Sequence, residues 1–187
     1  MRRPLVWAGA IVFGALCLPA AAMRAAGPSD PVTTVPAVDL TRYLGTWYEI
    51  ARYDNWFQKS CAGDVAATYA TRADGRLDVT NVCRTSNGAT KTAKGLAEVV
   101  DQKTRARLKV RFAPAFLSFL PMVWGDYWVL GLADDYSWSV VGTPDRKYLW
   151  ILARTPALTE TQQNAVLTVV GAQGFEKQRL LYTKQGN

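Results

Sequence analysis

The chain has 187 residues, of which 49% are apolar, 11% aromatic and 20% charged, and its formal net charge at pH 7 is +7. These proportions are typical of one globular domain with a sizeable core and exclude a disordered or fibrous polymer. The sequence has no histidine and only three cysteines, which excludes histidine-based catalytic triads, histidine-ligated zinc and four-thiolate metal sites. We therefore expect no metal and no cofactor.

Residues 1–22 have the pattern of a secretory signal peptide. Arg2 and Arg3 precede an uncharged stretch that ends in three alanines, a typical cleavage site. Two alternatives stay open. The stretch is long enough to act as an uncleaved membrane anchor. Cys17 could also carry a lipid, although Leu16 replaces the small residue that a bacterial lipobox has before its cysteine.

Cleavage after Ala22 would leave 20 basic and 15 acidic side chains, a formal charge of +5. Positive and negative residues alternate along the chain, which favours a solvated surface over a nucleic-acid-binding stripe. Cleavage would also leave two cysteines in an oxidising compartment. We predict that they form one disulfide, Cys61–Cys83, with two buried free thiols as the alternative.

A flexible segment, 23–38, with three prolines, is expected to precede a single domain that spans 39–187. In this domain polar and apolar residues alternate, and turn residues recur every eight to twelve positions, which indicates antiparallel strands. The predicted strands are Thr46–Asp54, Asp64–Thr71, Leu77–Arg84, Lys91–Val100, Arg105–Phe112, Tyr127–Leu132, Trp138–Gly142 and Tyr148–Thr155. Eight strands joined mostly by short hairpins predict an all-β protein, an up-and-down antiparallel barrel without exposed edges.

One helix is predicted after the eighth strand. Thr159 and Gln162 have the spacing of a capping box, and Gly174 can end the helix. Between them an apolar stripe at helical spacing comprises Ala165, Val166, Val169 and Val170. A single stripe suits a helix that packs against the outside of the barrel. Residues 179–183 are predicted to form a short final strand.

Three short motifs follow one another along the predicted barrel. Residues 45–52 read GTWYEIAR, residues 134–136 read DDY, and residues 142–156 read GTPDRKYLWILARTP. They resemble the three sequence motifs of the lipocalin family, specifically the bacterial outer-membrane type related to apolipoprotein D, although Asp134 replaces the threonine of the second motif. The resemblance covers residues 38–184 and implies a lipid-binding barrel in the bacterial cell envelope, at the periplasm or the outer membrane.

The resemblance implies structural roles for Trp47 and Arg154. In lipocalins the tryptophan closes one end of the barrel, and an arginine of the last strand packs across its ring. We expect a cation–π contact between these two residues and hydrogen bonds from Arg154 to carbonyls of the entry turn. With the first strand running toward the mouth, Cys61 and Cys83 both fall on the mouth rim, which agrees with the predicted disulfide.

Side-chain alternation counted from Trp47 and Arg154, together with the resemblance, predicts the lining of the barrel. The expected ligand contacts are Glu49, Ala51, Tyr53, Val79, Asn81, Val110, Phe112, Tyr127, Val129, Trp150 and Leu152. Small residues, namely Ala51, Ala97 and Gly131, are expected to leave room between them. The lining is mostly apolar and aromatic and suits a long-chain lipid. The alternative is that these side chains simply fill the core.

Two features are predicted at the mouth. Residues 112–124, FAPAFLSFLPMVW, contain no charged residue and are too apolar for an ordinary solvated loop. They are expected to dock on a bilayer, to form a dimer contact or to fold over the mouth. Six basic residues are predicted to lie near the rim, where they could meet an anionic head group: Lys59, Arg84, Lys91, Arg111, Arg146 and Lys147.

The predicted function is binding and storage or transport of a fatty acid or lysophospholipid, without catalysis and without a nucleic-acid partner. Two alternatives come from other classes. One is a lipid-modifying enzyme with Glu49 or Tyr127 as its acid–base group. The other is a binder of a haem-like or pigment ligand. The sequence leaves the choice between monomer and dimer open.

Overall fold

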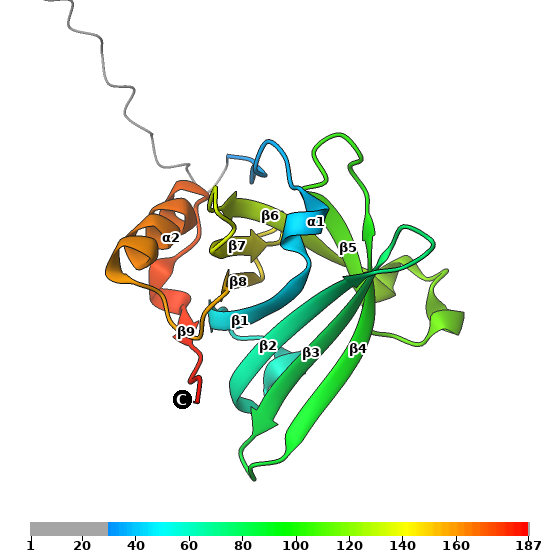
Figure 1. The fold of residues 1–187 in the computed structure, drawn as a ribbon, viewed down its shortest axis with the longest axis horizontal. Helices are drawn as coiled ribbons and strands as arrows, with labels where there is room; N and C mark the ends of the chain where they lie inside the picture. The colour runs from blue at the N-terminus through cyan, green and yellow to red at the C-terminus, as the bar shows by residue number, and fades with distance from the viewer. Residues whose placement is uncertain (1–29, 187) are drawn as a thin grey trace, which may run out of the picture.

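The computed structural model describes residues 30–186, so the predicted signal peptide, its cleavage site and Cys17 lie outside the described residues. Its strands are β1 (Gly45–Arg52), β2 (Cys61–Thr71), β3 (Leu77–Thr85), β4 (Thr90–Val99), β5 (Arg107–Arg111), β6 (Gly125–Leu132), β7 (Trp138–Gly142), β8 (Leu149–Ala153) and β9 (Leu181–Tyr182). Neighbouring strands pair from β2 through β8 to β1, and β1 pairs again with β2. Eight antiparallel strands therefore close into a barrel, as predicted (Figure 1).

β5, β8 and β9 are each three residues shorter than predicted. β5 begins at Arg107 and not at Arg105, because Arg105 has a φ of +55°, a left-handed conformation that does not fit an extended strand. β9 has two residues because the preceding segment, Lys177–Arg179, forms the 3₁₀ turn η4. β9 pairs with β1 beside the barrel seam.

Residues 30–38, the described part of the segment before the barrel, pack against the rest of the domain. Val32 and Val38 are buried, and the N–H of Val38 donates to the carbonyl of Thr104 at 2.8 Å. A short helix that was not predicted, α1 (Leu40–Tyr43), follows directly, with the Asp39 side chain as its N-cap. These residues cover the base of the barrel (Figure 1).

Trp47 fills the closed end. Its side chain is fully buried, and its indole N–H donates to the carbonyl of Tyr43 at 2.8 Å. The Arg154 guanidinium lies 3.8 Å from the centre of the Trp47 ring. It also donates to the backbone carbonyls of Thr46 and Arg42, at 2.9 and 2.7 Å. The base is thus held by ring packing and charge-assisted hydrogen bonds together.

Helix α2 (Glu160–Ala172) packs outside the barrel against β6 and β7 and begins with the predicted capping box. Its contact with the sheet is close, because a Cβ at Gly131 would lie 2.7 Å from a methyl of Val169. Gly131 therefore faces the helix. It was expected to leave room inside the barrel, and this expectation is wrong. A register shift between Val129 and Gly131 causes the difference. No helix in the described part of the chain is long and apolar enough to cross a membrane.

Candidate ligand-binding cavity

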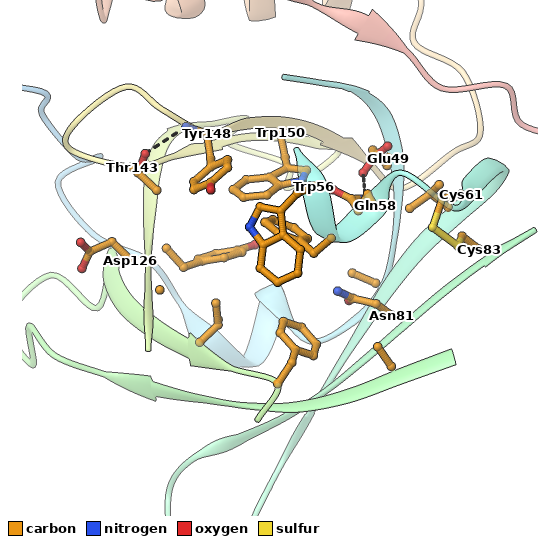
Figure 2. Close-up of a pocket in the computed structure, with 18 of the residues that line it drawn as sticks. Glu49, Trp56, Gln58, Cys61, Asn81, Cys83, Asp126, Thr143, Tyr148 and Trp150 are labelled. Carbon is orange, nitrogen blue, oxygen red and sulfur yellow. Dashed lines mark hydrogen bonds between the residues drawn. A yellow bond between two sulfur atoms is a disulfide. The ribbon is translucent and has the colours of Figure 1, made fainter. Parts of the chain in front are cut away.

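The barrel contains a cavity of about 800 Å³ that reaches the mouth, where the β1–β2, β5–β6 and β7–β8 loops meet (Figure 2). This volume falls within the range of small-molecule sites. Its lining is dominated by aliphatic and aromatic side chains, among them Val65, Ala66, Ala67, Tyr69, Val110, Phe112, Tyr127, Trp150 and Leu152. The barrel is therefore hollow above its plugged base.

The floor of the cavity presents tyrosine rings. The Tyr127 hydroxyl lies 2.9 Å from the hydroxyls of both Tyr43 and Tyr69, and the Tyr43 hydroxyl lies 3.1 Å from that of Ser139. Burial raises the pKa of all three phenols above the usual value. Near neutral pH these hydroxyls are uncharged and bonded to one another, and of the three residues Tyr69 and Tyr127 line the cavity.

One wall near the mouth is a cluster of aromatic side chains. Tyr148 and Trp150 stack with ring centres 5.9 Å apart, and Phe57 lies 5.6 Å from Tyr148. Trp56, which is 74% exposed, extends this cluster toward solvent through an edge contact with Phe57. Figure 2 shows Trp56, Tyr148 and Trp150 around the entrance. The entrance is therefore apolar on this side.

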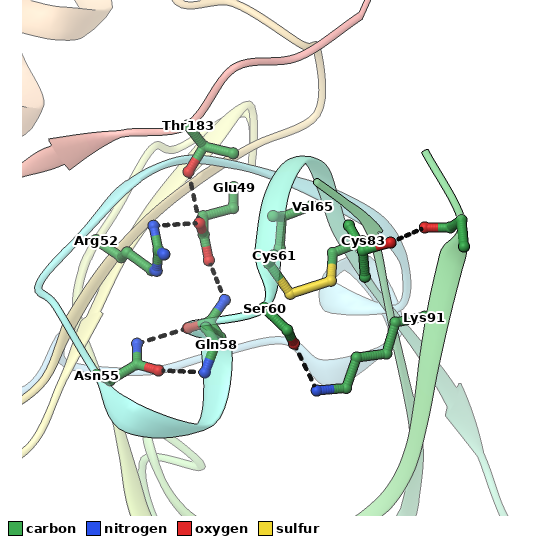
Figure 3. Close-up of a disulfide and its surroundings, with 12 residues drawn as sticks. Glu49, Arg52, Asn55, Gln58, Ser60, Cys61, Val65, Cys83, Lys91 and Thr183 are labelled. Atoms are coloured by element: carbon green, nitrogen blue, oxygen red, sulfur yellow. Dashed lines mark hydrogen bonds and ion pairs between the residues drawn. A yellow bond between two sulfur atoms is a disulfide. The ribbon is translucent and has the colours of Figure 1, made fainter. Parts of the chain in front are cut away.

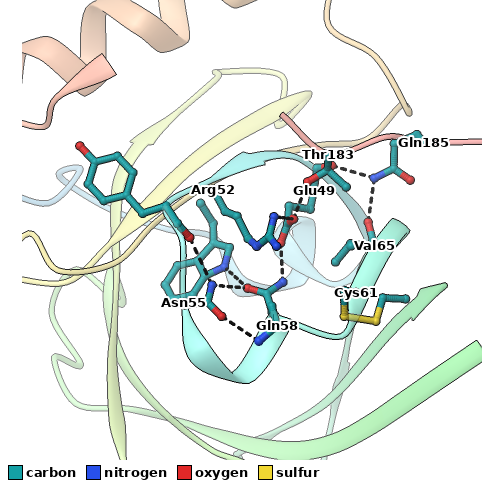
Figure 4. Close-up of polar contacts among 11 residues, drawn as sticks. Glu49, Arg52, Asn55, Gln58, Cys61, Val65, Thr183 and Gln185 are labelled. Atoms are coloured by element: carbon teal, nitrogen blue, oxygen red, sulfur yellow. Dashed lines mark hydrogen bonds and ion pairs between the residues drawn. A yellow bond between two sulfur atoms is a disulfide. The ribbon is translucent and has the colours of Figure 1, made fainter. Parts of the chain in front are cut away.

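A polar network joins this wall to the first mouth loop, which contains the 3₁₀ turn η1 (Trp56–Gln58). The Gln58 amide donates to the Glu49 carboxylate at 2.7 Å and accepts from the Trp150 indole N–H at 3.0 Å. Asn55 donates a third hydrogen bond to Gln58, at 2.7 Å. The network fixes the mouth loop to the cavity wall (Figure 4).

Glu49 is the buried acid of this network, with a relative exposure of 3%. Its carboxylate accepts the Thr183 hydroxyl at 2.5 Å and lies 3.6 Å from the Arg52 guanidinium. Burial raises the pKa of Glu49, while the hydrogen bonds from Thr183 and Gln58 and the charge of Arg52 oppose that rise. The carboxylate is thus engaged on both oxygens.

The structure places the predicted ligand contacts in three groups. Seven of them line the cavity, namely Glu49, Asn81, Val110, Phe112, Tyr127, Trp150 and Leu152. Val79 and Val129 are buried in the core cluster around Trp47, together with Ala97. They belong to the plug at the base and not to the cavity lining.

Ala51 and Tyr53 were assigned to the wrong face of β1. Both are buried in the cluster between the barrel and α2, and the Tyr53 hydroxyl donates to the carbonyl of Glu176 at 2.9 Å. The pairing of β1 with β8 shifts register between Glu49 and Ala51. One extra residue in a strand reverses the side-chain alternation beyond it, which explains the error.

Five of the six predicted basic residues do not line the cavity. Of the six, only Lys91 lines the cavity, and its ammonium donates to Ser60 at 2.8 Å. Arg84 forms an ion pair with Asp64 at 2.5 Å. Arg146 donates to the carbonyls of Gln173 and Asp30 at 2.8 and 2.5 Å. Both guanidinium groups therefore have partners within the protein.

The other three basic residues also lie outside the lining. Arg111, the last residue of β5, is buried and donates to the carbonyl of Ala113 in the β5–β6 loop at 2.5 Å. The Lys147 ammonium lies 5.4 Å from the centre of the Tyr148 ring. Lys59 is exposed in the mouth loop. The presence of a basic residue in a predicted mouth loop thus does not by itself indicate a cationic binding site.

The apolar segment between β5 and β6, residues 112–124, forms a compact lip with two 3₁₀ turns, η2 (Ala115–Leu117) and η3 (Pro121–Val123). The Trp124 indole N–H donates to the carbonyl of Ser118 at 2.9 Å, and Arg111 holds the other end of the lip through Ala113. Three side chains point outward: Phe116, Phe119 and Met122 are 74%, 76% and 84% exposed. The lip is therefore pinned while its apolar side chains face solvent.

The predicted disulfide is confirmed. Cys61 and Cys83 are bonded, with their Cα atoms 5.5 Å apart, and both line the cavity beside Lys91 (Figure 3). The β2–β3 pairing has register shifts on either side of Gly63. The bond thus holds the two strands together where their ladder is irregular.

Sequence reasoning missed the first mouth loop. Trp56, Phe57 and Gln58 line the cavity, although alternation along strands cannot assign them because they lie between strands. The only available signal was the pair of adjacent aromatic residues in a predicted turn. Tyr148 was likewise missed, although the alternation that places Leu152 and Trp150 on the inner face extends to Tyr148.

Comparisons with known proteins agree with this geometry. A family model described as a lipocalin-like domain matches residues 38–185. The outer membrane lipoprotein Blc of Escherichia coli K12 is 38% identical over 159 residues, 84% of this chain and 85% of that protein. Temperature-induced lipocalin-1 of Arabidopsis thaliana is 38% identical over 155 residues, 82% of each chain. Apolipoprotein D of mouse is 27% identical over 168 residues, 86% of this chain and 82% of that protein.

Solved structures share the fold at lower sequence identity. Insecticyanin from the tobacco hornworm Manduca sexta superposes with a TM-score of 0.65 at 19% identity, over 87% of this chain and 88% of that one. Apocrustacyanin C1 gives a TM-score of 0.64 at 13% identity, over 80% and 81% of the two chains.

Proposed function

The chain belongs to the lipocalin family, and on that basis we propose that it holds a fatty acid or lysophospholipid, acyl chain first, inside its barrel in the bacterial cell envelope. The observation that carries the proposal is the cavity of about 800 Å³ with an apolar wall and an uncharged tyrosine floor. Burial of an acyl chain in such a cavity is favourable by about 25 cal/mol per Å² of apolar surface, before the costs of association.

The relatives named outer membrane lipoproteins support the envelope location. The expected export signal of this chain, residues 1–22, lies outside the described residues. Mass spectrometry of protein recovered from the periplasm would report cleavage after Ala22, or lipidation at Cys17, by mass.

Titration of a fluorescent fatty acid into delipidated protein tests the proposed function. We expect saturable binding at micromolar concentrations, with one probe per barrel. Absence of saturation from a protein with an intact circular-dichroism spectrum would contradict the proposal. Competition by lysophospholipids of the same chain length would then rank the two head groups.

Trp150→Asp is expected to weaken binding more than it weakens the fold. The new carboxylate would stand in the apolar wall, where an entering acyl chain must desolvate it. We expect the Kd to rise by about 30-fold, or about 2 kcal/mol, and the free energy of unfolding to fall by about 1 kcal/mol. Probe titration and urea unfolding measure the two quantities.

Val100→Asp is the control, because Val100 is 55% exposed in the turn between β4 and β5, away from the cavity lining. It should leave the Kd unchanged. Equal losses of binding and stability in Trp150→Asp would make Trp150 a core residue and not a ligand contact.

A second activity, docking of the lip on a bilayer, is favoured by its exposed Phe116, Phe119 and Met122. Residues 112–124 lie at the mouth and carry no charge, so insertion would bring the cavity entrance to the lipid surface. We expect the triple substitution to serine to reduce co-sedimentation with phosphatidylglycerol–phosphatidylethanolamine vesicles by at least about fivefold. Val100→Ser is the matched control.

Light scattering separates docking on a bilayer from a dimer contact. If the wild type is a dimer and the triple variant a monomer, with vesicle binding unchanged, the lip is a contact between copies and the docking proposal fails.

Catalysis is not part of the proposal, because both acid–base candidates are engaged. Tyr127 is buried with a raised pKa and two hydroxyl partners, which makes it a poor base near neutral pH. Glu49 is held by Thr183 and Gln58. The haem-like or pigment alternative would need axial ligation from tyrosine or methionine, because the sequence has no histidine. The absorption spectrum of the purified protein tests that alternative.

A further inference from the structure

The wall of the barrel has a seam between β1 and β2. Their pairing begins at Gly45 and Tyr69 and ends at Tyr48 and Ala66, although β2 continues to Cys61. Beyond this point the two strands make no ladder with each other. Glu49 on one side of the seam, and Val65 and Cys61 on the other, line the cavity.

Residues 183–186 fill this seam. The Gln185 side-chain amide donates to the carbonyl of Glu49 at 2.7 Å and to that of Val65 at 2.9 Å, one from each strand (Figure 4). The N–H of Thr183 donates to the carbonyl of Ile50, and the N–H of Asp64 donates to the carbonyl of Lys184, at 2.9 and 2.8 Å. Residues 183–186 therefore take the place of the missing ladder.

The strands are shaped to accept this segment. A Cβ at Gly63 would lie 2.5 Å from the carbonyl oxygen of Lys184, so a side chain there would displace the tail. The N–H of Gly186 donates to the Asp64 carboxylate, which is held on its other side by Arg84. Residues of β2, as well as residues 183–186 themselves, therefore fix the position of this segment.

The segment is held by polar contacts and buries little apolar surface. Thr183 and Gln185 are half-buried, and Lys184 and Gly186 are exposed. Segments that have few apolar contacts and solvent-exposed hydrogen bonds open locally at low free-energy cost. By contrast, the neighbouring part of β1 is anchored by Ala51, which is fully buried.

We propose that residues 183–186 form a releasable strap that closes a second, lateral opening into the ligand cavity between β1 and β2. When the strap leaves, the gap between Glu49 and Val65 exposes the side of the cavity, and an acyl chain can pass through the wall as well as through the mouth. The proposal rests on the proposed function, because its cargo is the same ligand.

The Glu49 carboxylate connects the strap to the mouth. It accepts the Thr183 hydroxyl from the strap at 2.5 Å and the Gln58 amide from the mouth loop at 2.7 Å (Figure 3). Displacement of either element removes one of its two hydrogen-bond partners. Opening at the seam and opening at the mouth loop are therefore coupled through this residue.

Hydrogen exchange tests whether the strap opens by itself. We expect the amides of Thr183 and Asp64 to exchange faster than those of the β1–β2 ladder. Gln185→Ala should accelerate them about 30-fold, because two hydrogen bonds of about 1 kcal/mol each are lost. Lys184→Ala is the matched control, since Lys184 contributes its backbone carbonyl and its side chain is exposed. Exchange of these amides only with global unfolding would overturn the proposal.

Stopped-flow kinetics with a fluorescent fatty acid test the opening. In Gln185→Ala, and in a chain that ends at Tyr182, we expect the association and dissociation rates both to rise at least about fivefold, with the Kd changed less than threefold. This pattern follows because a second path changes rates and not the bound state. Lys184→Ala should match the wild type.

The outcomes separate the two proposals. If the wild type binds no probe, the proposed function fails and the lateral opening fails with it. Suppose that the wild type binds the probe and hydrogen exchange shows a released strap. If the association and dissociation rates of the variants then equal those of the wild type, the ligand uses the mouth alone and only the lateral opening is overturned. If the truncated chain does not fold, Gln185→Ala still decides.

Discussion

Trp47→Ala is expected to lower the free energy of unfolding by about 4 kcal/mol, the usual cost of removing a fully buried tryptophan. The ring packs against Tyr43 with centres 4.8 Å apart and supports the Arg154 guanidinium from below. Its removal leaves a cavity and also takes away the partner of a carbonyl at the end of α1. A loss of this size is a large share of the 5–15 kcal/mol typical of a domain.

Urea unfolding followed by far-ultraviolet circular dichroism measures this loss. Trp56→Ala is the control, because it removes the same side chain from a position that is 74% exposed. It should change the free energy of unfolding by at most about 0.5 kcal/mol. Equal losses in the two variants would mean that Trp47 does not hold the base of the barrel.

Replacement of Cys61 and Cys83 together by serine is expected to cost about 3 kcal/mol. The bond links residues 22 positions apart, and a loop of this length restricts the unfolded chain by about that amount in the chain-entropy model. In the native state the double substitution removes the covalent link at the part of the β2–β3 pairing where the register shifts. We therefore expect faster amide exchange at the rim in addition to the lower stability.

The reduced wild type provides the check, because reduction breaks the bond without changing the sequence. Its free energy of unfolding should match that of the double serine variant to within about 0.5 kcal/mol. If the oxidised wild type is no more stable than either, the disulfide contributes nothing to the fold and its role lies elsewhere.

The fold was predictable because several local signals agree. Alternation gave the strands, Thr159 and Gln162 gave the start of α2, and the three motifs gave the closed end around Trp47. These features depend on residues close together in sequence, or on a pattern with a fixed period. Consistency among such signals is what specifies one structure.

The cavity was harder to predict, because counting in twos fails at a bulge. The register shift after Glu49 turned Ala51 and Tyr53 toward α2, and a second shift turned Gly131 the same way. Nothing in the sequence marks either shift. The placement of Arg146 beside Gln173, and of Gln185 between two strands, depends on contacts over more than 25 and 100 residues respectively, which local patterns do not encode.

The buried apolar side chains of the described residues form two separate clusters. One cluster surrounds Trp47 and reaches the cavity lining at Tyr69, Tyr127 and Leu152, and another lies between the wall and α2. We therefore expect the scaffold to remain folded without a ligand. If the proposed function holds, the ligand would enter and leave without unfolding of the barrel, and occupancy would raise the melting temperature through mass action.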